Sequence, residues 1–188
     1  MINEMEKGRI IEAVDRLCDY KLEYWIDEYS ESLVKTLSER KMHISCAESC
    51  TAGLVAAAIG SVPGASDVME ASFVTYSEAA KARFANVSMD TIRTYGVVSP
   101  QVAQEMAGGV LRYAGLEYGV GIGITGYAGP SGEQPGRVCI GIRVLQDDPV
   151  VGIEDMYYGI DHVFTGSRNI VRQKAAATAL IFAFLALV

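Results

Sequence analysis

A serine lies in the chain where nucleophilic chemistry could occur. Ser49 follows the short apolar run at residues 43–46 and precedes the alanine-rich segment at residues 54–59. A hydroxyl at a strand-to-helix junction faces unpaired backbone N–H groups and the positive end of a helix. This setting suits an anionic ligand, or a serine nucleophile whose oxyanion is held by N–H groups near Cys50 and Thr51. On the residues alone, the commoner role of Ser49 is a helix N-cap, and Thr51 could equally be that cap.

A second candidate segment, residues 73–81, reads FVTYSEAAK. Ser77 can cap the following helix, which places Lys81 one turn in, on the side of the cap. The positive end of a helix lowers the pKa of a nearby lysine, as a lysine base requires. The alternative for Lys81 is an exposed surface lysine. Tyr76 is either a core aromatic residue or a phenol that relays a proton.

A third candidate is the glycine-rich stretch at residues 121–132, GIGITGYAGPSG. An apolar strand runs into a loop containing Gly126 and Gly129, where the backbone can approach a ligand closely. Backbone amides there could hold a phosphate or an amide, although glycine-rich turns are often only turns. The stretch lacks GK[ST] and is not followed directly by a helix pattern, so it is neither a Walker A loop nor a dinucleotide-binding fingerprint.

The remaining inventory excludes several function classes. His43 and His162 do not lie at metal-ligand spacing with the cysteines or carboxylates, so we expect no metal and no cofactor. Nothing in the sequence brings either histidine to Ser49, so a Ser-Lys pair is favoured over a Ser-His-Asp triad. The net charge of −7 and the pI near 4.9 argue against nucleic acid as a partner. Four cysteines without a CxxC pair indicate reduced thiols in a cytoplasmic protein.

The pattern of elements predicts a three-layer α/β/α fold in one domain. We expect strands near residues 43–47, 70–75, 118–124, 137–145 and 150–158, and helices near residues 51–59, 78–85, 89–95, 100–114 and 168–187. Ser99 and Pro100 are a favourable helix start. The uncharged segment at residues 175–188 is shorter than the roughly 20 residues that span a bilayer, so we expect a buried helix in a soluble protein with no membrane partner.

The N-terminal part of the chain has a helical pattern of its own. Apolar residues from Ile10 to Leu37 recur at intervals of three or four, with one gap of five. The pattern is longer than a typical globular helix. It therefore predicts a break near Tyr29 and Ser30, or a role in self-association as a homodimer or higher homo-oligomer.

Four motifs taken together resemble the C-terminal domain of the CinA family, which includes stand-alone nicotinamide-nucleotide amidohydrolases. They are AESCTAG, FVTYSEAAK, YGVVSPQVAQEMAGGV and GITGYAGPSG, in family order and at comparable spacing. The resemblance runs from about Ser30 to the C-terminus, which divides the chain into a helical extension (1–29) and a CinA-like domain (30–188). It implies a three-layer α/β/α fold with a mixed, mostly parallel five-stranded sheet.

The resemblance also implies a reaction and residue roles. The reaction is hydrolysis of nicotinamide mononucleotide, a pyridine nucleotide, to nicotinate mononucleotide and ammonia. By motif, Ser49 is the nucleophile, and Tyr76 and Lys81 handle protons. Thr125 contacts the substrate amide or the oxyanion, and Arg168 is a phosphate partner.

The chain departs from the family pattern at three places. Ala52 replaces a glycine, Tyr127 replaces an isoleucine, and the loop at residues 131–137 is about four residues shorter than usual. Two alternative functions follow from these departures and from the N-terminal extension. One is a nucleotide-binding or protein-interaction module without catalysis. The other is an amidase that acts on a different substrate, phosphorylated or not.

Overall fold

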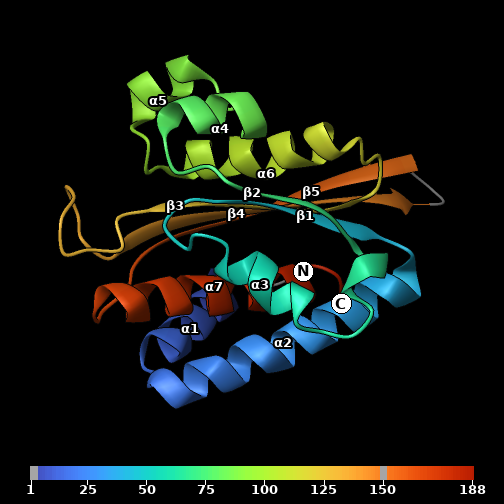
Figure 1. Ribbon diagram of the computed structural model, residues 1–188, viewed down its shortest axis with the longest axis horizontal. Coiled ribbons are helices and arrows are strands. Elements are labelled where there is room, and N and C mark those ends of the chain that lie inside the picture. The colour runs from blue at the N-terminus through green and yellow to red at the C-terminus, as the bar shows by residue number, and fades with distance from the viewer. Residues whose placement is uncertain (1–3, 149–151) are drawn as a thin grey trace.

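A mixed five-stranded sheet is the middle layer of the molecule (Figure 1). The computed structural model describes residues 4–148 and 152–188. The strands, in spatial order, are β2 (Met69–Val74), β1 (His43–Glu48), β3 (Gly119–Gly126), β4 (Arg137–Asp148) and β5 (Gly152–Val163). β1 pairs in parallel with β2 and β3, whereas β4 pairs antiparallel with β3 and β5. Four of the five strands therefore point the same way, which confirms the predicted mixed, mostly parallel sheet.

Helices cover both faces of the sheet, as the three-layer prediction requires (Figure 1). One face carries α1 (Glu4–Asp15), α2 (Asp19–Arg40), α3 (Leu54–Gly60) and α7 (Arg168–Leu185). The other carries α4 (Glu78–Ala85), α5 (Met89–Tyr95) and α6 (Pro100–Ala114), and a short 3-10 turn, η1 (Ala65–Asp67), precedes β2. The bounds of α4, α5 and α6 are the predicted ones. Serine side chains cap all three helices, at Ser77, Ser88 and Ser99.

The last strand is longer than predicted. β5 ends at Val163, five residues beyond the predicted end, and its predicted start at residue 150 lies outside the described residues. β4 and β5 pair continuously from Arg137 opposite Val163 to Asp148 opposite Gly152. In the extra length, Asp161 is held by this partner strand, since Arg137 of β4 forms a bidentate ion pair with it (2.9 and 2.8 Å).

The predicted helix break near Tyr29 and Ser30 is wrong. α2 continues through both residues, and the break falls between Asp15 and Asp19. This position coincides with the gap of five in the apolar pattern, between Leu17 and Leu22, where a single apolar stripe cannot continue. The division of the chain into residues 1–29 and 30–188 stays a prediction, as does self-association.

Two glycines of β3 allow α6 to lie directly on the sheet. A Cβ at Gly121 would lie 2.1 Å from the Ala107 carbonyl oxygen, and one at Gly123 would lie 2.3 Å from that of Ala103. Any side chain at these positions would therefore force α6 away. These two glycines of the glycine-rich stretch serve packing between helix and strand, not ligand binding.

The apolar C-terminal segment is a helix of the core, as predicted. α7 buries its alanines together with Leu180, Ile181 and Phe182. Within the described residues, no helix has the combination of length and apolar character that crossing a membrane requires.

The three mutually parallel strands place the candidate motifs at one edge of the sheet. Ser49 follows β1, Tyr76 follows β2, and Thr125 lies at the end of β3. Glu48, the last residue of β1, is paired with Val74 on one side and Ile124 on the other. The chain passes from β1 to β2 on one side and later to β3 on the other, so this edge is a topological switch point, where α/β proteins bind ligands.

Candidate active site

A cavity of about 330 Å³ opens at the carboxyl ends of the three parallel strands. Its wall includes seven of the nine predicted site residues: Ser49, Cys50, Tyr76, Lys81, Thr125, Gly126 and Arg168. Thr51 and Gly129 do not line it, although both adjoin residues that do. His43 and His162 lie outside it.

Lys81 and Ser49 are in direct contact within this cavity. The Lys81 Nζ lies 2.9 Å from the Ser49 Oγ and donates a second hydrogen bond to the Thr75 carbonyl oxygen at 2.7 Å. Lys81 is 1% exposed and Ser49 is 7% exposed, so the alternative of a surface lysine is wrong. A buried amine within hydrogen-bond distance of a hydroxyl is the arrangement of a nucleophile and its general base.

The start of α4 explains how Lys81 reaches Ser49. Ser77 caps α4 by accepting a hydrogen bond from the Ala80 N–H at 3.1 Å, as predicted, and Lys81 follows one turn into the helix. The Thr75 N–H donates to the Glu48 carbonyl oxygen at 2.7 Å, which ties the end of β2 to the end of β1. The chain segments that carry Ser49 and Lys81 are therefore hydrogen-bonded to each other close to the contact between these two residues.

Burial lowers the pKa of Lys81 from its ordinary value of 10.5 to about 8. Removal of the ammonium from water is the largest cause, and the negative charge of Glu78 opposes it only in part. A substantial fraction of Lys81 is therefore neutral at mildly alkaline pH and able to accept a proton from Ser49. Burial also raises the pKa of Cys50 to about 12, so this neighbouring residue stays a thiol.

The carboxylate of Glu48 caps the N-terminus of α3. Its Oε2 accepts hydrogen bonds from the N–H groups of Gly53 (2.9 Å) and Val55 (3.2 Å), and its Oε1 accepts one from Ala56 (2.9 Å). Glu48 is fully buried, and the positive end of the helix stabilises its charge. The sequence interpretation missed this role. The available signal was an acidic residue at the end of an apolar strand, where a buried charge needs fixed donors.

Neither Ser49 nor Thr51 is the N-cap of α3, so that alternative is wrong. The cap position is Gly53, which has no side chain to accept a bond, and the helix begins at Leu54 instead of the predicted residue 51. Because Glu48 supplies the acceptors for the N–H groups of α3, the Ser49 hydroxyl is available to Lys81.

Glu48→Gln is expected to lower the free energy of unfolding by about 2–3 kcal/mol, because a neutral amide offers one acceptor oxygen where the carboxylate offers two charged ones. Urea unfolding measures the loss. The matched control is Glu117→Gln, at an exposed glutamate before β3. Equal stability of the two variants would contradict the capping role.

Arg172, on α7, holds the backbone that follows the serine. Its Nε donates to the Cys50 carbonyl oxygen at 3.1 Å, and its Nη2 donates to that of Thr51 at 3.0 Å. The C=O and N–H groups of a trans peptide point in opposite directions, so this contact turns the Thr51 N–H away from Arg172. Among the described residues, neither the Cys50 nor the Thr51 N–H donates to a backbone acceptor. Both donors are therefore free of backbone partners beside Ser49. The sequence interpretation did not find Arg172.

Tyr76 and Arg168 form a second pair at the cavity. The Arg168 Nη2 donates to the Tyr76 Oη, and its Nη1 donates to the Gly129 carbonyl oxygen, both at 2.8 Å. Tyr76 is 57% exposed, so the alternative of a core aromatic residue is wrong. Within the described part of the chain, no hydrogen bond joins the Tyr76 hydroxyl to Ser49 or Lys81. The direct contact of Tyr76 is instead with the guanidinium.

Thr125 lies buried in the cavity wall with its hydroxyl proton already engaged. Its Oγ1 donates to the Val97 carbonyl oxygen at 2.8 Å. A hydroxyl has one proton and two lone pairs, so toward the cavity Thr125 can act only as an acceptor. That geometry suits a contact with an N–H₂ group and does not suit a contact with an oxyanion.

Two of the three departures from the family pattern have visible consequences. Ala52 has a φ of 54°, in the left-handed region that favours glycine, and a side chain there costs roughly 1–2 kcal/mol. Tyr127 lines the cavity, and a Cβ at Gly132 would lie only 2.7 Å from its ring, so the tyrosine ring packs closely on the loop at residues 131–137.

Comparisons with known proteins agree with this architecture. The chain is 39% identical over 159 residues to a nicotinamide-nucleotide amidohydrolase PncC from Enterobacter agglomerans, which covers 82% of this chain and 91% of that protein. It is also 39% identical over 175 residues to a CinA-like protein from Syntrophobacter fumaroxidans, covering 90% of this chain but 39% of that protein. The chain thus spans about two fifths of the length of this longer relative.

Solved structures of the same superfamily have the same fold. A competence/damage-inducible protein from Agrobacterium tumefaciens aligns with a TM-score of 0.77 at 29% identity, covering 87% of this chain and 95% of that one. A CinA superfamily protein from Escherichia coli aligns with a TM-score of 0.74 at 31% identity, covering 86% and 89%. The CinA C-terminal domain family matches residues 26–186. The chain therefore belongs to the CinA C-terminal domain family.

Proposed function

We propose that the protein is an amidohydrolase that converts nicotinamide mononucleotide to nicotinate mononucleotide and ammonia. The observation that carries the proposal is the 2.9 Å contact between the Lys81 Nζ and the Ser49 Oγ, two buried residues in the cavity at the strand ends. The similarity to the PncC amidohydrolase supports the choice of substrate. We further propose that the protein works in the cytoplasm as a homo-oligomer, with a pyridine nucleotide as its small-molecule partner.

The proposed mechanism proceeds through an acyl-enzyme. Neutral Lys81 removes the Ser49 proton while the Ser49 Oγ attacks the carboxamide carbon. The N–H groups of Cys50 and Thr51 stabilise the resulting oxyanion. The C–N bond then breaks, and Lys81 returns the proton to the departing amine, which leaves as ammonia. A water molecule, deprotonated by Lys81, then attacks the ester carbon; the bond to the Ser49 Oγ breaks, Lys81 returns the proton to that oxygen, and the carboxylate product leaves.

Substrate orientation follows from the other wall of the cavity. Thr125 accepts a hydrogen bond from the carboxamide N–H₂ group, because its own proton is engaged with Val97. Arg168 binds the phosphate of the nucleotide with its guanidinium, held by Tyr76 and Gly129 at the rim. The amide and the phosphate are thus bound by separate groups.

Ammonia release from nicotinamide mononucleotide and from nicotinamide riboside tests the proposal. We expect kcat/KM to be roughly 10- to 100-fold higher for the nucleotide, because hydrogen bonds to a charged group are worth about 1.5–3 kcal/mol. Release from neither compound would overturn the proposed activity. Equal release from both would show that the phosphate is not recognised and would favour a non-phosphorylated substrate.

Arg172→Met is expected to lower kcat by roughly 10- to 100-fold with a smaller change in KM, since small displacements of reacting groups cost about this much. Arg172→Lys, which can reach only one of the two carbonyls at a time, should have a kcat between those of Arg172→Met and the wild type. Steady-state kinetics measure both. The control is Arg112→Met, at an exposed arginine near the end of α6. A normal kcat for Arg172→Met would remove the positioning role of Arg172.

A further inference from the structure

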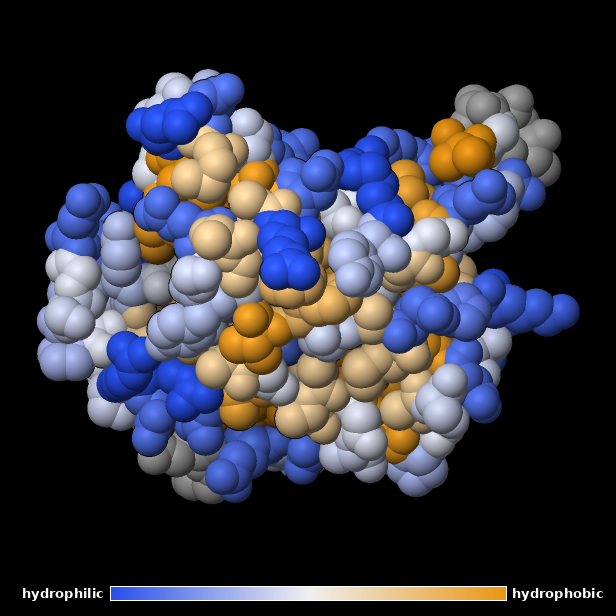
Figure 2. All heavy atoms as spheres, turned by 45° about the horizontal axis from the view of Figure 1, so that its top comes forward, coloured by the Kyte–Doolittle hydropathy of each residue, from blue (hydrophilic) through white to orange (hydrophobic). Residues whose placement is uncertain are grey.

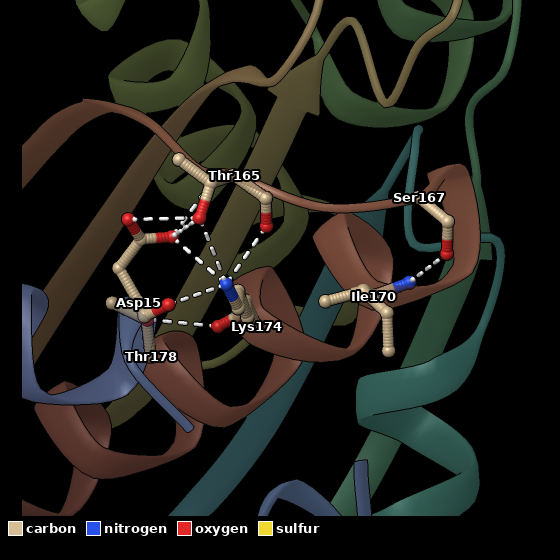
Figure 3. A network of polar contacts seen from close by, with 6 residues as sticks. All are labelled: Asp15, Thr165, Ser167, Ile170, Lys174 and Thr178. Carbon is tan, nitrogen blue, oxygen red and sulfur yellow. Dashed lines mark hydrogen bonds and ion pairs between the residues drawn. The ribbon is translucent and has the colours of Figure 1, made fainter. Parts of the chain in front are cut away.

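Helix α1 lies before the family-matched segment and contributes no residue to the candidate cavity. It is nevertheless joined to the chain just ahead of the arginines of α7. Figure 3 shows Asp15, the last residue of α1, beside Lys174 of α7 and Thr165 of the segment that connects β5 to α7. These three residues form a dense polar network that spans 159 positions of sequence.

Lys174 is the centre of this network. Its Nζ donates to the Thr165 carbonyl oxygen at 2.7 Å, to the Asp15 Oδ1 at 3.0 Å and to the Thr165 Oγ1 at 3.3 Å. It also donates to the main-chain carbonyl of Asp15, at the C-terminal end of α1. Lys174 is only 3% exposed, so these contacts take the place of water around its ammonium.

Asp15 holds Thr165 as well as Lys174. Its Oδ1 accepts a hydrogen bond from the Thr165 N–H at 2.8 Å and lies 3.2 Å from the Thr165 hydroxyl. Removing the Asp15 carboxylate would leave the Thr165 N–H without its acceptor and the buried Lys174 without its counter-charge. A buried charge that loses its partner is strongly unfavourable, so the local structure must rearrange.

The segment fixed by the network is the one that presents Arg168 and Arg172. Thr165 precedes Arg168 by three residues, and Ser167 between them caps α7 through the Ile170 N–H at 3.5 Å (Figure 3). Arg172 lies one turn after Arg168 and two residues before Lys174. The network therefore holds the chain on both sides of these two arginines, at Thr165 before α7 and at Lys174 within it.

We infer that Asp15 is a positioning residue for the candidate active site: through Thr165 and Lys174 it fixes the start of α7, and with it Arg168 and Arg172. The kinetic part of this inference rests on the proposed amidohydrolase function; the structural part does not. The extension therefore contributes to the geometry of the site, although none of its described residues lines the cavity.

Amide hydrogen exchange of residues 165–172 tests the structural part. We compare wild type with Asp15→Ala, Asp15→Asn and the matched control Glu12→Ala, a change on the same helix that removes an exposed ion pair with Arg16. Asp15→Ala should exchange at least ~10-fold faster in this segment, because local opening frees its backbone groups. Asp15→Asn keeps an acceptor oxygen and should be intermediate, and Glu12→Ala should match wild type. Unchanged exchange in Asp15→Ala would overturn the inference.

Kinetics at a temperature where all variants are folded test the effect on the site. We expect KM for nicotinamide mononucleotide to rise roughly 10-fold in Asp15→Ala because Arg168 loses its fixed position, and kcat to fall because Arg172 loses its own, with partial rescue of both in Asp15→Asn. A merely structural anchor would lower Tm and leave kcat and KM unchanged; faster exchange with normal kcat and normal KM would therefore overturn the positioning role. If Asp15→Ala does not fold, the exchange and the kinetics of Asp15→Asn and Thr165→Val are compared with those of wild type instead. If wild type releases no ammonia, the proposed function fails and exchange alone decides whether Asp15 fixes α7.

Discussion

Ser49→Ala is expected to lower kcat/KM for ammonia release from nicotinamide mononucleotide by roughly 10³-fold or more, because loss of a nucleophile leaves only the contributions of binding and the oxyanion donors. The Ser49 hydroxyl contacts Lys81 and is not used to cap α3, since Glu48 has that role. The fold should therefore tolerate its removal. Mass spectrometry of the wild type quenched during turnover should also show an ester on the peptide that contains Ser49.

Ser45→Ala is the matched control for this variant. Ser45 lies four residues earlier on β1, is fully buried, and its Oγ has no hydrogen-bond partner among the described residues. Its loss tests the effect of deleting a buried hydroxyl from the strand that leads to Ser49, at a position that does not line the cavity, and activity should stay normal. If Ser49→Ala kept more than about a tenth of wild-type activity, the covalent mechanism would be wrong.

The framework of the fold was predictable because its signals are local. Apolar runs marked the strands, and Ser99 followed by Pro100 marked the start of α6. The break after α1 was misplaced although the apolar pattern contained it. At the gap between Leu17 and Leu22 the apolar stripe moves to another face of the helix. Such a shift ends a helix more effectively than the residue types near Tyr29 do.

The candidate site was predictable only in part, because some of its contacts depend on tertiary packing. Motif order brought Ser49, Lys81 and Thr125 into one hypothesis. It could not show that Glu48 caps α3 or that Arg172 reaches back from α7, since both depend on where helices pack after the sheet has formed. For the same reason Tyr76 was expected near the proton transfer, whereas its described partner is Arg168.

Lys81→Met is expected to lower kcat/KM by roughly 10²–10⁴-fold, the usual contribution of a general base. Methionine keeps much of the length and apolar volume of the lysine stem, so the variant removes the amine with little change in packing. In wild type, kcat/KM should rise with pH and level off above an apparent pKa of about 8, because only neutral Lys81 can accept the Ser49 proton. A pH profile of ammonia release measures this inflection, and a flat profile across it would exclude Lys81 as the base.

The same substitution is expected to raise stability while it removes activity. Lys81 binds its proton more weakly in the folded chain, where its pKa is about 8, than in the unfolded chain, where it is 10.5. The ionisation of Lys81 therefore lowers the free energy of unfolding by about 3 kcal/mol at any pH below 8. This loss becomes smaller as pH rises from 8 to 10.5. Lys81→Met should gain up to this amount in free energy of unfolding at neutral pH and lose the advantage in alkali, as urea unfolding at both pH values would show. If the variant were destabilised at neutral pH and the difference did not change with pH, Lys81 would be an ordinary charged lysine, and the proposed base would have to be sought elsewhere.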